Sequence, residues 1–199
     1  VAWEWVRRHA KKPAIMNYSA GGSSSSSLRE LSAIDLLTKE GIPVVAAAGN
    51  DGKDACLGSP SDIPDVVSVG ATDRLDETPS WSDYGPCVDL FAPGANIVSS
   101  SITEDPDGKS MSGTSMAAPH VTGAIAAYWS DHPDVSGQEA VIGVLRQAVP
   151  AVRFPYGQAG SPNLLLQVES EQEPSPSASP QPTRSSTPAT PTVDPISNT

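Results

Sequence analysis

Residues 112–120 read Ser-Gly-Thr-Ser-Met-Ala-Ala-Pro-His and are the most informative segment of this 199-residue chain. They place Ser115 between a glycine turn and an alanine-rich helical segment. Backbone N–H groups and the dipole at the start of a helix stabilise negative charge, so a serine held there is suited to nucleophilic attack. The alternative is a serine that only caps a helix, but such a cap requires neither the Gly-Thr before Ser115 nor the Met-Ala-Ala-Pro after it.

A second segment, residues 41–50, reads Gly-Ile-Pro-Val-Val-Ala-Ala-Ala-Gly-Asn. It predicts a short buried strand that ends in Gly49-Asn50. Acyl transfer needs a hydrogen-bond donor aimed at the developing oxyanion, and an amide side chain on a fixed loop supplies one without a charge. Gly-Asn alone is also a common turn, so Asn50 gains this interpretation only together with Ser115.

The two segments resemble the oxyanion and nucleophile segments of subtilisin-like serine proteases, the subtilase family (peptidase S8). The sequence at 50–56 and 84–91 is most similar to the proteinase K and aqualysin branch of that family. The resemblance covers residues 3–168. It implies a secreted serine endopeptidase that acts on polypeptides and needs no cofactor for its chemistry. It also implies that Ser115 is the nucleophile and that Asn50 and the Ser115 N–H group stabilise the oxyanion.

A serine nucleophile needs a histidine base, and the base needs an orienting carboxylate. In the family the aspartate lies in Asp-Thr-Gly or Asp-Ser-Gly and the histidine in His-Gly-Thr, and neither pattern occurs in this sequence. For His9, His120 and His132 we expect structural or solvent-exposed roles. We therefore expect the C-terminal part of a subtilase catalytic domain, inactive alone, whose N-terminal segment or pro-peptide is missing.

Two other functions stay open. A catalytically inactive fragment or pseudoenzyme would at most bind extended peptides in its cleft. A pure interaction protein would depend on the C-terminal tail and would not account for the folded part. An in-frame Asp-Thr-Gly and His-Gly-Thr in the nucleotide sequence directly upstream would favour the protease.

The apolar pattern predicts an α/β fold. Nearly all-apolar strands are expected at residues 14–19, 43–48 and 66–71. They alternate with helices, which is typical of a parallel sheet covered on both faces. Ser27 with Glu30 and Ser136 with Glu139 have the spacing of capping boxes that open two of these helices. The resemblance implies a subtilisin-like three-layer α/β/α sandwich with a mostly parallel sheet, incomplete at its N-terminal side.

Composition separates a domain from a tail. Residues 1–168 are expected to form the catalytic-domain part, whereas residues 169–199 are mainly Pro, Ser and Thr and should be disordered because they cannot bury enough apolar surface. A net charge of −11 argues against a nucleic-acid partner, since phosphate contacts need basic clusters. No apolar run is long enough to cross a membrane. We expect a monomer.

The chain has two cysteines, Cys56 and Cys87. Two cysteines alone do not establish a disulfide, and two buried free thiols are the alternative. The aqualysin-type relatives pair cysteines at these two places, so the resemblance implies a Cys56–Cys87 disulfide and an oxidising, extracellular location. Zinc is not expected, because no cysteine or histidine cluster has ligand spacing.

The substrate cleft follows from the resemblance. Residues 19–22, Ser-Ala-Gly-Gly, are similar to the family's Ser-Leu-Gly-Gly strand, whose backbone pairs with an extended substrate, and glycine allows that close approach. Small residues on all sides of the pocket suggest a roomy apolar pocket. The expected substrate-binding residues are Ser19, Ala20, Gly21, Gly22, Ala47, Ala48, Gly49 and Gly58.

Pro64, Val66 and Asp89 match positions that bind calcium in proteinase K. They would supply two backbone carbonyl oxygens and one carboxylate, and oxygen ligands suit Ca²⁺. The resemblance therefore implies a structural calcium ion, with water completing the ligand set. The alternative is that Asp89 caps a turn or pairs with a neighbouring group.

Overall fold

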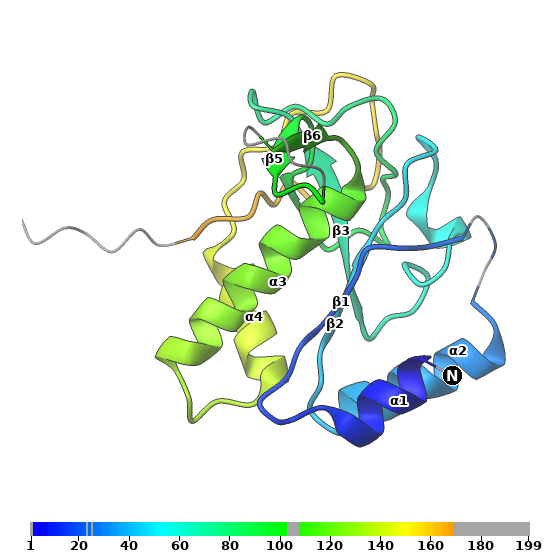
Figure 1. Cartoon of the computed structure of the whole chain (residues 1–199). Coiled ribbons are helices and arrows are strands. Elements are labelled where there is room, and N and C mark those ends of the chain that lie inside the picture. The colour runs from blue at the N-terminus through cyan, green and yellow to red at the C-terminus, as the bar shows by residue number, and fades with distance from the viewer. Residues whose placement is uncertain (1, 23, 25, 103–107, 169–199) are drawn as a thin grey trace, which may run out of the picture. The chain divides into compact units, whose positions relative to one another are not determined.

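A computed structural model describes residues 2–22, 24, 26–102 and 108–168 (Figure 1). These residues contain a sheet of four parallel strands in the order β1, β2, β3, β4. The strands are β1 (Met16–Tyr18), β2 (Val44–Ala47), β3 (Val66–Thr72) and β4 (Leu90–Pro93). Val45 pairs with Asn17 on one side and with Val67 on the other. The predicted parallel sheet is confirmed, although β1 is shorter than expected and β4 was not predicted.

Helices cover both faces of this sheet (Figure 1). They are α1 (Ala2–His9), α2 (Leu28–Lys39), α3 (Thr114–Asp131) and α4 (Gly137–Gln147), with a short 3-10 helix, η1, at Ala55–Leu57. A small antiparallel hairpin joins β5 (Ile97–Ser99) to β6 (Lys109–Met111).

Alternation along the strands fills two cores. Val45 of β2 packs in the cluster that contains Ala117 and Val121 of α3. Its neighbour Val44 packs in the other cluster with Ile34 and other residues of α2. Successive strand residues point to opposite faces, so one apolar strand supplies both layers of core. This arrangement is the three-layer α/β/α sandwich that the family resemblance implies.

A run of small residues on α3 is mostly exposed. Only Ala124 of this run is buried, whereas Gly123, Ala126 and Ala127 are exposed. The helix packs on the sheet and on α4 through its other face. Within the described part of the chain, nothing covers the small-residue face.

The two predicted capping boxes have different outcomes. Ser136 accepts a hydrogen bond from Glu139 N at 3.3 Å, and the Glu139 carboxylate accepts one from Ser136 N at 2.8 Å, so this box is complete. Ser27 accepts from Glu30 N at 3.2 Å, but the Glu30 carboxylate instead accepts from Ser59 Oγ at 2.7 Å. The second box is therefore half formed, because a tertiary partner replaces the local one.

Ser136→Ala should lower the free energy of unfolding by about 1 kcal/mol, because the first turn of α4 loses its side-chain cap. Chemical denaturation measures the change. Ser130→Ala, at an exposed position late in α3, is the matched control and should leave the midpoint nearly unchanged. Equal effects of the two substitutions would show that the cap contributes nothing.

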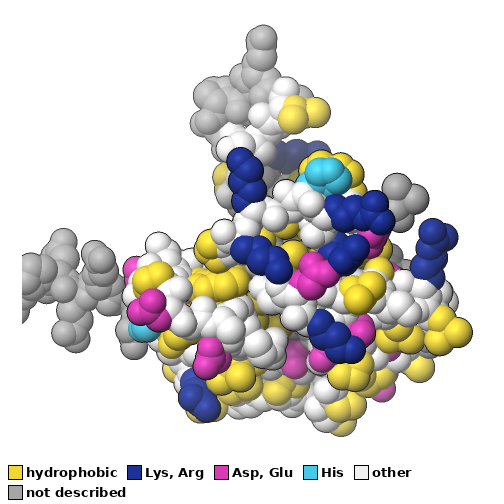
Figure 2. All heavy atoms as spheres, turned by 90° about the horizontal axis from the view of Figure 1, so that it is seen from below, with side chains coloured by type: hydrophobic (Ala, Val, Ile, Leu, Met, Phe, Trp, Pro, Cys, Tyr) yellow, Lys and Arg dark blue, Asp and Glu magenta, His cyan; other side chains and the backbone are white. Residues whose placement is uncertain are grey.

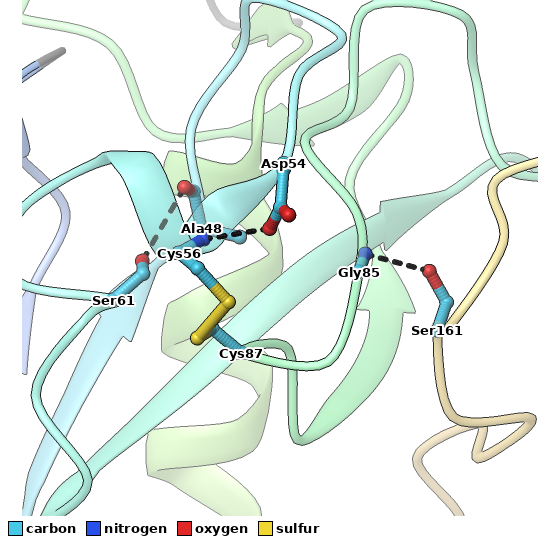
Figure 3. The surroundings of a disulfide bond; sticks show 7 residues. All are labelled: Ala48, Asp54, Cys56, Ser61, Gly85, Cys87 and Ser161. Carbon is cyan, nitrogen blue, oxygen red and sulfur yellow. Dashed lines mark hydrogen bonds between the residues drawn. A yellow bond between two sulfur atoms is a disulfide. The ribbon is translucent and has the colours of Figure 1, made fainter.

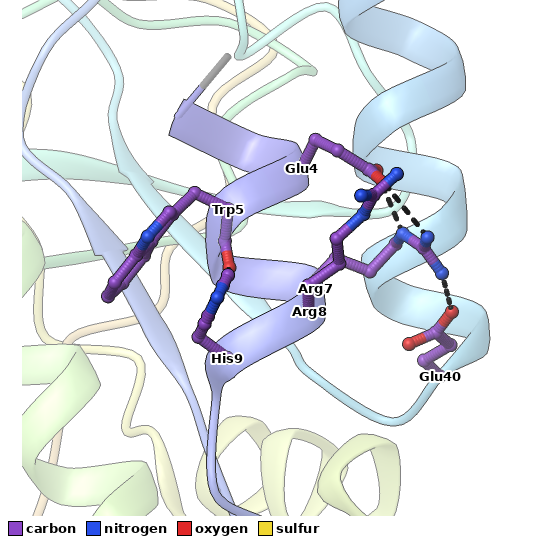
Figure 4. Close-up of polar contacts among 6 residues, drawn as sticks. All are labelled: Glu4, Trp5, Arg7, Arg8, His9 and Glu40. Carbon is purple, nitrogen blue, oxygen red and sulfur yellow. Dashed lines mark hydrogen bonds and ion pairs between the residues drawn. The ribbon is translucent and has the colours of Figure 1, made fainter.

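The face formed by α1 and α2 carries interspersed charges (Figure 2). The Glu4 carboxylate pairs with Arg7 and Arg8, and Arg7 also pairs with Glu40 at 2.6 Å (Figure 4). Hydrogen bonds from Arg7 and then Arg8 lower the pKa of Glu4 to about 2. The basic residues of α1 are thus partly neutralised by carboxylates, and the Arg7 side chain is partly buried.

The expected tail, residues 169–199, lies outside the described residues, and its disorder stays a prediction. In the described ranges, no helix combines the length and the apolar character needed to span a bilayer.

Candidate active site

The start of α3 is held against the carboxyl edge of the sheet. Gly94 follows β4, and its carbonyl accepts a hydrogen bond from Gly113 N at 2.8 Å. The contact needs glycine at position 94, because a Cβ there would lie 2.6 Å from the Ala71 Cβ and 2.9 Å from Gly113 O. Ser115 is therefore placed in the first turn of α3, where the sequence predicts it.

Ser115 contacts the segment that follows β1. Its hydroxyl donates to the carbonyl of Ser19 at 3.2 Å, and the Ser19 hydroxyl donates to the carbonyl of Ser115 at 2.9 Å. These two residues are 96 positions apart in the chain. The reciprocal pair brings the predicted nucleophile and the predicted substrate-pairing strand together.

Asn50, three residues after the end of β2, is oriented by the residue that precedes Ser115. Its Oδ1 accepts from Thr114 N at 2.8 Å and lies 3.0 Å from the Thr114 hydroxyl. A backbone N–H can only donate, so this atom of the amide must be the oxygen. The Nδ2 group is left free to donate elsewhere. An uncharged donor therefore stands next to the first turn of α3.

None of the three histidines is bonded to Ser115 in the described part of the chain. Each places its Nδ1 against the carbonyl of the helical residue four positions earlier, at 2.8 Å for His9 and His120 and 2.9 Å for His132. His9 also stacks on Trp5 (Figure 4). These are the structural and surface roles that the sequence suggests.

A cavity of about 460 Å³ adjoins Ser115 and Asn50. Seven of the predicted substrate-binding residues line it: Ala20, Gly21, Gly22, Ala47, Ala48, Gly49 and Gly58. Gly22 and Ser59 exchange two backbone hydrogen bonds, of 2.9 and 3.1 Å, which joins two of its walls. Whether these residues bind substrate stays a prediction.

The expectation of an apolar pocket is wrong. Four charged residues also line the cavity: Asp51, Lys53, Asp54 and Asp83. Sequence reasoning missed them because their loops carry no local signal that they meet beside Ser115. Asp83 is the most buried of the four, with 7% of its surface exposed. Burial is the main cause of its pKa being raised above the ordinary value, and hydrogen bonds from the backbone N–H groups of Lys53 and Asp51 oppose that rise.

Cys56 and Cys87 form the predicted disulfide, with an S–S distance of 2.12 Å and a Cα–Cα distance of 5.2 Å (Figure 3). Cys56 lies in η1, and Asp54 caps the start of this short helix. The Oδ1 atom of Asp54 accepts a hydrogen bond from Cys56 N at 2.9 Å. Asp54 and Leu57 both line the cavity. The disulfide therefore fastens one cavity wall to the loop before β4.

Of the expected calcium ligands, Val66 is the first residue of β3 and Asp89 directly precedes β4, the strand that pairs with β3. Asp89 accepts from Ser68 N at 2.7 Å, and Val66 is two residues before Ser68 on the same strand. Asp89 is exposed as a residue, yet partial desolvation of its carboxyl raises its pKa. No group of three or more His, Cys, Asp or Glu side chains suited to a metal occurs in the described ranges. The bond to Ser68 also fits the alternative role for Asp89.

Comparison with known proteins identifies the family of the chain. The Subtilase family model matches residues 2–163. The chain is 43% identical over 163 residues to an extracellular serine proteinase of Thermus sp. (strain Rt41A), covering 82% of this chain and 39% of that protein. It is 46% identical over 140 residues to subtilisin-like protease 1 of Trichophyton verrucosum, covering 67% of this chain and 33% of that protein.

A crystal structure of a cold-adapted subtilisin-like serine proteinase has the same fold, with a TM-score of 0.76 and 35% identity. The match covers 85% of this chain and 60% of that one. The chain spans about two fifths or less of the curated relatives named above. The fold is therefore subtilisin-like, and the chain belongs to the subtilase family, peptidase S8.

Proposed function

We propose that this chain is the nucleophile-bearing, C-terminal part of a serine endopeptidase domain. Membership of the subtilase family supports serine-type proteolysis of polypeptides. The observation that carries the residue assignment is the pairing of Asn50 Oδ1 with Thr114 N beside Ser115. It fixes an amide donor and a serine hydroxyl at one helix start, which is the arrangement that acyl transfer needs.

In this mechanism the Ser115 hydroxyl attacks the scissile carbonyl carbon. Its proton passes to a histidine base that an aspartate orients, and the base later protonates the leaving amine. The Ser115 N–H group and Asn50 Nδ2 stabilise the oxyanion. Water then hydrolyses the acyl-serine. The hydrogen bond from Ser115 to the Ser19 carbonyl must break before this sequence begins.

We propose further that the base and the orienting aspartate come from residues outside this 199-residue sequence. The family patterns for both are missing from it, and β1 is an edge strand in the described sheet. The exposed small-residue face of α3, Gly123, Ala126 and Ala127, offers a second surface for such a segment. The chain alone would then be inactive. A pseudoenzyme that only binds peptides is the alternative, favoured by the bond that holds the Ser115 hydroxyl on Ser19.

Localisation and a structural ion complete the proposal. An extracellular location is supported by the disulfide and by the name of the Thermus relative.

The Asp89 carboxylate, with the carbonyl oxygens of Pro64 and Val66, would hold calcium, because its Oδ1 has no hydrogen-bond partner in the described ranges and all three donors are oxygens. The ion would stabilise the loop and take no part in the chemistry. We propose a monomer, with no nucleic-acid partner.

A fluorophosphonate probe and a chromogenic tetrapeptide test the function. The purified chain should show no more than trace turnover. Fused to an N-terminal segment that carries the family's Asp-Thr-Gly and His-Gly-Thr, it should gain turnover and label at Ser115. Ser112→Ala is the matched control, since Ser112 lies on the same segment but only accepts from Asn96 N at 2.8 Å. A label on another serine would refute the assignment, and turnover by the unfused chain that Ser115→Ala abolishes would refute its inactivity.

A further inference from the structure

The cavity beside Ser115 holds an excess of negative charge. Lys53 pairs with Asp51 at 3.4 Å, and both side chains are more than half exposed. Asp54 and Asp83 form no ion pair with any residue that the structure describes. The cavity wall therefore presents two carboxylates without a cationic partner.

Asp83 is a built part of the cavity rather than a surface charge. Its N–H donates to Gly49 O at 3.0 Å, and its Oδ1 accepts from the backbone N–H groups of Asp51 at 2.9 Å and Lys53 at 3.0 Å. Only 7% of the surface of Asp83 is exposed. The N–H group of Gly52 is a third backbone donor toward this carboxylate. Its Oδ2 lies 2.1 Å from where a Cβ on Gly49 would be, so the carboxylate takes the place of a side chain at position 49.

Asp54 is held in the same way. Its Oδ1 accepts from Cys56 N at 2.9 Å, while its carboxylate packs against Gly85 (Figure 3). The disulfide at Cys56 fixes this segment of η1. Both carboxylates are thus held in place by backbone N–H groups where they line the cavity.

We infer that this cavity selects a Lys or Arg side chain on the substrate residue that precedes the scissile bond. The inference rests on the proposed function, because it takes the cavity next to Ser115 as the pocket for that side chain. A cavity of about 460 Å³ is large enough for a long side chain. Its walls at Gly21, Gly22, Gly49 and Gly58 carry no side chains to obstruct it.

The selectivity has two physical parts. A guanidinium or ammonium group donates charge-assisted hydrogen bonds to partly buried carboxylates, which are stronger than neutral ones. An apolar side chain would displace water from Asp54 and Asp83 without offering any donor, and burying a charge without a partner is costly. The pocket therefore attracts cations and also disfavours apolar groups.

Benzamidine and its neutral analogue benzamide test this in the 199-residue chain without any need for catalysis. Titration followed by NMR should show benzamidine binding at least about tenfold more tightly, with amide shifts centred on Gly49, Lys53 and Asp54. Asp83→Asn keeps an acceptor for the Asp51 and Lys53 N–H groups and should remove most of the preference. Asp134→Asn, at an exposed residue that does not line the cavity, is the control and should change it little.

The inference would be overturned if the unaltered chain bound benzamidine and benzamide equally, or if the amide shifts lay outside the cavity. It would also be overturned if the preference for benzamidine were unchanged in both Asp83→Asn and Asp54→Asn. Fluorophosphonate labelling of Ser115 does not depend on pocket charge. A labelled Ser115 with no preference for benzamidine therefore refutes only the selectivity, whereas the preference without labelling refutes only the proposed nucleophile.

Discussion

Asn50→Ala in the domain completed by an N-terminal segment should lower kcat by about 10²–10³-fold, the scale found when a subtilisin loses its oxyanion asparagine. KM should change little, because the oxyanion exists only along the reaction path. Steady-state kinetics on a chromogenic tetrapeptide measures both constants.

The control must distinguish two roles of the Asn50 side chain. Its Nδ2 group is the proposed oxyanion donor, and its Oδ1 atom accepts a hydrogen bond from Thr114 N. Asn50→Asp keeps an oxygen for Thr114, but it removes the Nδ2 donor and adds a negative charge beside the oxyanion. It should therefore lose at least as much kcat as Asn50→Ala. If Asn50→Asp retains activity, or if either variant mainly raises KM, Asn50 positions α3 or binds substrate and is not the oxyanion donor.

Replacing both cysteines by serine should lower the free energy of unfolding by about 4 kcal/mol. The sequence separation of Cys56 and Cys87 is 31 residues, and the entropy of closing a loop of that length in the unfolded chain sets this value. Denaturant unfolding compares the double variant with the oxidised protein. Such a loss is a large part of the stability of an ordinary domain.

The matched control is the unaltered protein kept reduced, which should unfold at the same denaturant concentration as the double variant. Mass spectrometry of an unreduced digest should show the two cysteine peptides linked. If the double variant and the reduced protein had the same unfolding midpoint as the oxidised protein, the disulfide would not constrain the unfolded chain.

Local patterns predicted much of this molecule. Ser115 and Asn50 were located because each belongs to a short segment with its own signature, and the helices after Ser27 and Ser136 were located by their caps. Strand β4 (Leu90–Pro93) was missed, since four residues ending in proline carry little strand signal.

The charged wall of the cavity could not be predicted for a different reason. Asp83 lies 32 residues from Asp51 and 30 from Lys53, the two residues whose N–H groups it binds. Its burial depends on how two loops dock, and no periodicity encodes that. The partner exchange of Glu30, from Ser27 to Ser59, has the same origin. Local rules failed where long-range contacts replaced local ones.

The proposed site is assembled from segments that follow the carboxyl ends of the strands: Ser19 comes after β1, Asn50 after β2, and Gly94, which anchors the start of α3, after β4. The apolar residues that hold the sheet together lie within the strands themselves. Evolution can thus alter the two sets separately. Exchanges among similar apolar residues in the strands would change the free energy of unfolding without altering the site. Changes in the loops would alter substrate specificity without altering the fold.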